Sequence, residues 1–169
     1  MEGTVIHILE RDSIFIDKIR SIFSNEMKEY SIIEYPYEVE GVPKQLFEEQ
    51  IEHGAFRRLQ TILLKKKELK ENDMIIGRSS GILKREEKYL YQIFVMIYYR
   101  NQLYTLESDL IEIPIENLLY ITRAQSNSEL SLGEQWKIHE GEVLKKLTRG
   151  IYDEFEIFQD TLREFLKNI

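Results

Sequence analysis

The chain has 169 residues, with 30 Asp and Glu against 23 Lys and Arg, and therefore a formal net charge of −7. It contains no cysteine, which excludes disulfides, cysteine-ligated zinc, iron–sulfur clusters and thiol catalysis. No apolar run approaches the roughly 18 residues that a membrane-spanning helix needs, and the start of the chain lacks the features of a secretory signal. We therefore expect a cytoplasmic protein with no cofactor, no metal and no membrane contact.

The first 70 residues predict a β-α-β-α order. Residues 4–9 form a short apolar run that is typical of a buried strand. Apolar residues then recur every three or four positions over 13–30, which predicts an amphipathic helix. Residues 31–35 are a second strand candidate, and the helical period returns over 44–70, where Gly54 weakens the middle of the helix.

An acidic group follows the first predicted strand. The segment VIHILERDSIFIDKIRSIF (5–23) resembles the opening of bacterial response-regulator receiver domains, in which an acidic pair after the first strand holds magnesium. Here Arg11 separates Glu10 from Asp12, and the aspartate that such domains phosphorylate has no counterpart. We therefore expect Asp12 to cap the following helix, and assign no metal to Glu10, Asp12 and Asp17.

Residues 74–123 predict a central antiparallel sheet, because short apolar runs alternate there with short polar breaks. The run Tyr89–Tyr99 is the strongest strand signal, and the segment Gly77–Gly81 is predicted to be a turn. A phosphate-binding loop is disfavoured, since no Gly-Lys-Ser/Thr follows these glycines. The strands are expected at 74–76, 89–99, 102–107, 110–113 and 116–123, with turns near 100–101 and 108–109.

The C-terminal part carries the clearest periodicity in the chain. Apolar residues from Leu144 to Ile169 are spaced by three or four positions, which predicts a helix over about 140–168 that Gly150 could interrupt. Residues 125–135 are polar and predict a loop. The expected fold is a single α+β domain over 1–169: a short N-terminal β-α-β-α segment, the central antiparallel sheet and a long C-terminal amphipathic helix. A division near residue 72, into 1–71 and 72–169, is the alternative.

Two surfaces are candidates for binding. The apolar stripe of the last helix packs on the sheet or on a partner, and we expect its C-terminal end to face a protein partner or a second copy. The basic face of the second helix could contact nucleic acid, although the acidic balance of the chain disfavours this. The partner-binding candidates are Phe158, Leu162, Phe165 and Ile169, and the possible nucleic-acid face is Arg57, Arg58, Lys65, Lys66 and Lys67.

No catalytic constellation is visible. His7, His53 and His139 each lack a nearby Ser or Asp in a recognisable catalytic pattern, so we expect structural roles for them. The sequence therefore favours a small regulatory or adaptor protein that acts through protein–protein contacts without catalysis. The alternatives are a small-molecule-sensing module with an aromatic pocket, a nucleic-acid-associated transcriptional regulator and a hydrolase with an unrecognised carboxylate pair.

Overall fold

The computed structural model describes residues 3–26, 29–36, 39, 50–66, 68–117 and 131–169. The strands are β1 (Thr4–Ile8), β2 (Tyr30–Glu34), β3 (Met74–Arg85), β4 (Lys88–Tyr99), β5 (Gln102–Glu107) and β6 (Ile111–Glu112). The helices are α1 (Ser13–Glu26), α2 (Gln50–Lys65), α4 (Leu132–Trp136), α5 (Val143–Leu147) and α6 (Glu154–Lys167), with short 3-10 turns η1 (Ile115–Asn117) and η2 (Glu140–Glu142).

One mixed sheet organises these elements into an α+β fold. Its strand order is β2-β1-β3-β4-β5, and β6 pairs with β4. The strand β1 runs parallel to both β2 and β3, whereas β3, β4 and β5 are antiparallel. Segments on both sides of residue 72 thus belong to one sheet. The predicted antiparallel arrangement is confirmed for β3, β4, β5 and β6, and the parallel strands β1 and β2 extend the same sheet.

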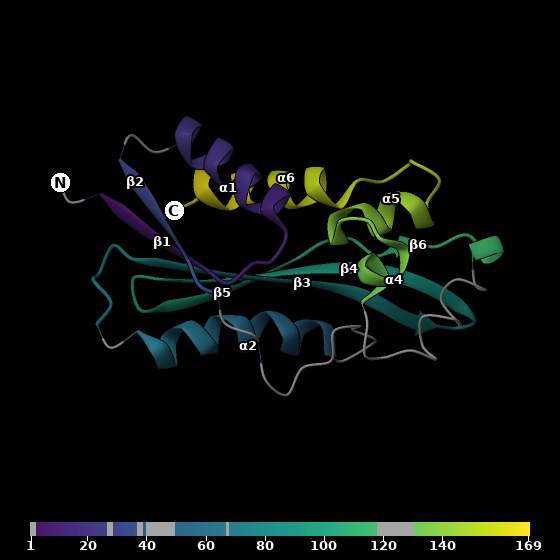
Figure 1. Cartoon of the computed structure of the whole chain (residues 1–169), viewed down its shortest axis with the longest axis horizontal. Coiled ribbons are helices and arrows are strands. Elements are labelled where there is room, and N and C mark those ends of the chain that lie inside the picture. Colours follow the sequence, from purple (N-terminus) through teal and green to yellow (C-terminus); the bar gives the residue numbers. More distant parts are fainter. Residues whose placement is uncertain (1–2, 27–28, 37–38, 40–49, 67, 118–130) are drawn as a thin grey trace.

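Helices cover both faces of the sheet (Figure 1). The helices α1 and α6 lie over one face, and α2 lies over the other. Successive residues of β4 serve opposite faces: Ile93 and Val95 pack in the core under α1 and α6, whereas Phe94 and Met96 pack in the core under α2. Burial on both faces explains why this strand is apolar almost throughout.

The segment Gly77–Gly81 is strand, so the predicted turn is wrong. The strand β3 continues through it to Arg85, and the hairpin to β4 turns instead at Glu86 and Glu87, whose φ values are 47° and 66°. Gly77 is needed here because a Cβ at this position would lie 2.6 Å from the carbonyl oxygen of Ala55 on α2. The glycine therefore marks a close approach of helix to strand.

The antiparallel strands that follow are confirmed within the described residues. The strands β4 and β5 are joined through Arg100 and Asn101, which adopt positive φ values of 49° and 60°. A break at 108–110 separates β5 from the two-residue strand β6. The last predicted strand, 116–123, begins as the 3-10 turn η1, and its residues 118–123 lie outside the described residues.

The predicted helix over 140–168 is divided into η2, α5 and α6. The chain turns after α5 because Arg149 and Gly150 adopt positive φ values of 53° and 84°, which end a helix. The helix α6 then begins at Glu154 and is capped by Asp153, whose side chain accepts from the Phe155 N–H. A short helix, α4, also lies inside the predicted loop over 125–135.

The remaining helix bounds differ at their ends. The helix α1 starts as predicted at Ser13 and ends at Glu26, and α2 ends at Lys65 rather than 70, without a break at Gly54. The start of the second predicted helix, 44–49, lies outside the described residues. Over the described part of the chain, no helix combines the length and the apolarity required to cross a bilayer.

We expect Gly77→Ala to lower the free energy of unfolding by about 1–3 kcal/mol, because the added methyl must push α2 away from β3. Urea denaturation measures the change. Thr105→Ala, on the exposed side of β5, is the control and should change stability much less. Equal effects of the two substitutions would show that the approach of α2 to Gly77 is not tight.

Candidate functional site

A buried ionic cluster joins the end of β1, the two central strands and the start of α6. On β3, Arg78 donates from Nε to Glu10 Oε2 and from Nη1 to Glu154 Oε2, each at 2.8 Å. Tyr91, on β4, donates to the other oxygen of Glu154 at 2.5 Å. Arg78 is 7% exposed and Glu154 is 0% exposed. These four side chains are called the Arg78 cluster below.

The electrostatics of the Arg78 cluster differ between its two carboxyl groups. Burial acts to raise the pKa of Glu10, but the charge and hydrogen bonds of Arg78 outweigh burial and lower this pKa. For Glu154, burial dominates and raises the pKa despite the same partner. Burial also raises the pKa of Tyr91. Arg78 itself lies 3.6 Å over the Phe15 ring, a cation–π contact that completes its enclosure.

The contacts of this cluster indicate a structural role. A general acid must reach the atom that it protonates, whereas Glu154 is fully buried and both of its oxygens are engaged by Arg78 and Tyr91. Breaking one partner of such a buried ion pair leaves an uncompensated charge in the interior. The cluster therefore holds the first turn of α6 against the sheet.

Asp12 caps α1, as the sequence predicts. Its Oδ1 accepts from the Ile14 N–H at 3.0 Å, and its carboxylate also binds the His139 ring and the Gly141 N–H. Glu10 is turned instead toward Arg78, and Asp17 is exposed on α1. Among the described residues, no group of three His, Asp or Glu side chains could hold a metal ion.

His7 is the most enclosed of the three histidines. It is buried in β1, with Nδ1 2.8 Å from the Tyr35 hydroxyl and Nε2 3.1 Å from Asp73 Oδ2. Burial lowers its pKa, against the opposing hydrogen bond to Asp73. Both ring nitrogens have partners inside the protein, consistent with the structural role expected from the sequence.

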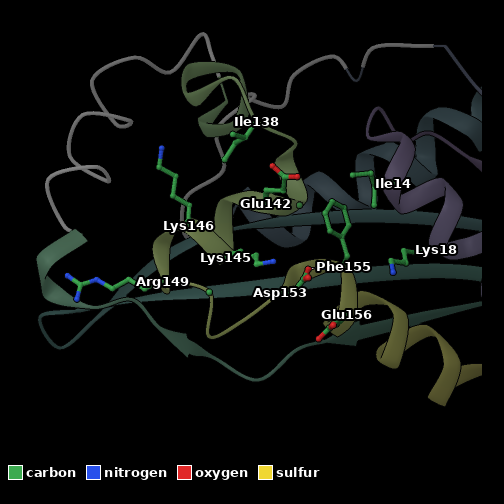
Figure 2. Close-up of a pocket in the computed structure, with 12 residues that line it drawn as sticks. Ile14, Lys18, Ile138, Glu142, Lys145, Lys146, Arg149, Asp153, Phe155 and Glu156 are labelled. Atoms are coloured by element: carbon green, nitrogen blue, oxygen red, sulfur yellow. Dashed lines mark hydrogen bonds between the residues drawn. The ribbon is translucent and has the colours of Figure 1, made fainter.

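An open hollow lies beside the start of α6, where α1, α5 and α6 meet (Figure 2). Its volume is about 680 Å³, within the range of about 300–1,000 Å³ that is usual for small-molecule sites. We call it the α5 pocket. Its lining residues are Ile14, Lys18, Ile138, Gly141, Glu142, Lys145, Lys146, Arg149, Gly150, Asp153, Phe155 and Glu156.

Phe155 lies in the wall of the α5 pocket and links it to the Arg78 cluster. Its ring centroid lies 4.6 Å from that of Phe15, the ring beneath the Arg78 guanidinium. A Cβ at Gly141 would overlap the Phe155 ring, so this glycine lets the ring lie directly on the backbone. The pocket wall and the buried cluster are therefore parts of one packed unit.

The structure places most of the predicted partner-binding residues in the core. Phe158, Leu162 and Phe165 are 1%, 0% and 7% exposed, and the Phe165 ring packs at 4.9 Å from that of Tyr104. The expectation that Phe165 faces a partner is therefore corrected: β5 of the same chain covers its ring. Ile169, at 49% exposure, is open to solvent, and its role in partner binding stays a prediction.

The residues of the predicted basic face of α2 differ in their exposure and in their contacts. Arg58 is half-buried and donates to the Gly54 carbonyl, and burial lowers its pKa to about 10 despite the nearby charge of Glu10. Arg57 donates to Gln60 on its own helix. The lysines are more open: Lys65 is exposed, Lys66 is half-buried and Lys67 lies outside the described residues. Nucleic-acid binding by this face stays a prediction.

Comparisons with known proteins establish the fold alone. No family model matches the chain, and a search of curated proteins gave no match. Among solved structures, it is similar to protein VC0702 from Vibrio cholerae, with a TM-score of 0.69 and 18% sequence identity. The alignment covers 96% of this chain and 92% of that one. At this identity the likeness describes the shared architecture.

We expect Arg78→Met to lower the free energy of unfolding by about 3–5 kcal/mol, because it leaves two buried carboxyl groups without their cation. Urea denaturation at neutral pH measures this loss. Lys84→Met, at an exposed position of the same strand, is the control and should change stability much less. A small loss in the Arg78 variant would contradict the structural role of the cluster.

Glu154→Gln tests the raised pKa of this group. The contribution of Glu154 to stability is fully present below its unfolded value of 4.5 and is lost as pH rises through the higher folded value. Glutamine removes this titration, so the stability of the variant relative to the natural protein should rise as the pH is raised from 4 to neutral, on top of a pH-independent loss of the Glu154 contacts. The measurement is urea denaturation across that range; parallel pH profiles would refute the assignment.

Proposed function

We propose that this protein is a small regulatory protein that acts by binding, without catalysis, and that it takes a small molecule in the α5 pocket. The observation that carries the proposal is the pocket itself: an open hollow of about 680 Å³ with charged and apolar side chains around it. The carboxyl groups of the Arg78 cluster, by contrast, are engaged inside the protein.

The pocket is lined by three separate helical elements, and this arrangement supports a regulatory role. Its lining comes from α1, from α5 and its flanking segments, and from the first turn of α6. A ligand that contacts all three would tie them together, and a ligand that binds only the folded state stabilises it. Ligand binding would therefore change the stability and the position of α6. A partner protein that contacts α6 can detect such a change.

Contact with a protein partner is the second candidate function. Two large apolar side chains near the ends of α6 are open to solvent, Ile151 at 74% and Ile169 at 49% exposure. The acidic net charge of −7 supports a protein over a nucleic acid as the macromolecular partner.

Ligand binding in the α5 pocket is tested with ¹⁵N-labelled protein and a panel of metabolites, followed by NMR. We expect shifts on α1, α5 and the first turn of α6. Ile14→Trp should abolish them, because the larger side chain fills the hollow that Ile14 lines. Leu103→Trp, on the exposed side of β5, should leave them intact. A panel without pocket shifts, or full binding by a folded Ile14 variant, would contradict the proposal.

The partner surface is tested by Ile169→Ser and by light scattering over a range of concentrations. If α6 contributes its end to self-association, the natural protein should form dimers and the variant should remain a monomer. Its thermal stability should be nearly unchanged, because Ile169 is already half open to solvent. A natural protein that is monomeric at every concentration would argue against self-association through this end.

A further inference from the structure

We infer that the α5 pocket takes a zwitterion of the amino-acid class: a small molecule with one anionic group, one cationic group and an apolar side chain. The inference rests on the proposed function, namely that this pocket is a ligand site, and it names the chemistry of the ligand. Three features of the lining support it: its charges, their lack of mutual pairing and its apolar wall.

Charges of both signs surround the same hollow. The lining contains four cationic side chains and three carboxylates. Among the described residues, none of these seven side chains forms an ion pair with another. The cations are Lys18, Lys145, Lys146 and Arg149, and the carboxylates are Glu142, Asp153 and Glu156.

Two cations are better placed than the others to bind an anionic group. In the view of Figure 2, Lys18 and Lys145 lie on either side of Phe155, whereas Lys146 and Arg149 extend away from it. Lys146 also has another contact, since its Nζ lies 4.6 Å over the Trp136 ring. The ligand's carboxylate is therefore assigned to Lys18 and Lys145, which reach the pocket from α1 and α5.

The carboxylates receive the cationic group. Asp153 already serves α6, because its Oδ1 accepts from the Phe155 N–H at 2.9 Å. Glu142 in η2 and Glu156 in the first turn of α6 form no ion pair with the described residues. Of the two, Glu142 is the less exposed. A ligand ammonium group is assigned to Glu142, whose carboxylate lies on the Ile14 side of the Phe155 ring in Figure 2.

A ligand of a single charge sign fits this lining less well. A simple anion would face three carboxylates, and a simple cation would face four positive side chains. Charged groups contribute most when each finds an opposite partner in its own binding position. A zwitterion places an opposite charge against both kinds of side chain at once.

The apolar part of the wall selects the side chain of the ligand. Ile14 and Ile138 are half-buried at the pocket, and the Phe155 ring lies between α1 and α6. Apolar surface removed from water here favours an apolar amino acid over a polar one. We therefore assign the pocket to free amino acids with large apolar side chains, such as phenylalanine or leucine.

Calorimetry with three forms of one side chain tests the inference: phenylalanine, N-acetylphenylalanine, which is only anionic, and phenylalaninamide, which is only cationic. We expect phenylalanine to bind at least about tenfold more tightly than either derivative, since each derivative loses one charged contact. Leucine should behave like phenylalanine against its own two derivatives.

Variants identify the groups responsible. Lys145→Met and Glu142→Gln should each weaken phenylalanine binding about tenfold. Lys145→Met should also reduce the advantage of phenylalanine over phenylalaninamide, because the amide derivative has no carboxylate to contact that lysine. The matched controls are Lys167→Met and Glu164→Gln at the far end of α6, which should leave affinity unchanged.

The outcomes separate this inference from the proposed function. If either derivative binds as tightly as phenylalanine, or if no apolar amino acid binds at millimolar concentration, the zwitterion assignment is overturned. The metabolite panel then decides the rest: another chemical class that shifts the pocket resonances preserves the pocket as a ligand site. A panel with no shifts at all overturns both.

Discussion

The placement of the Arg78 guanidinium between two buried carboxylates is the interaction on which the rest of the structure depends. It joins residues 68 and 76 positions away in sequence, Glu10 and Glu154, at a point where β1, β3 and α6 meet. Because an unpaired charge in this interior is costly, the cluster tolerates one arrangement of these elements. The position of α6, and with it one wall of the α5 pocket, follows from that constraint.

Local sequence patterns predict those parts of the fold that local interactions determine. The apolar periods locate α1 and α2, and the capping role of Asp12 follows from its place before α1. The prediction fails at Gly77, because its glycine is explained by the close approach of Ala55 rather than by a turn. The parallel β1–β3 pair also cannot be predicted from local patterns, since it joins segments about 70 residues apart.

The candidate site could not be predicted for the same physical reason. The pocket brings together side chains from Ile14 to Glu156, and no spacing rule connects them. The apolar stripe of α6 was the sequence feature nearest to the site, and its rings form the core that supports the pocket. Gly150 was a sequence signal for one part of the site. The helix break predicted there is the bend between α5 and α6, beside the pocket.

The shared turn at the start of α6 has an evolutionary consequence. Consecutive residues there serve different purposes, since Glu154 enters the Arg78 cluster while Phe155 and Glu156 line the pocket. A change at Arg78 or Glu154 alone leaves a buried charge without its partner. A substitution at one of these two positions therefore requires a matching change at the other, whereas Glu156 is exposed and has no contact with the Arg78 cluster among the described residues. The charge of the pocket lining can therefore be changed at Glu156 without disturbing the buried cluster beneath it.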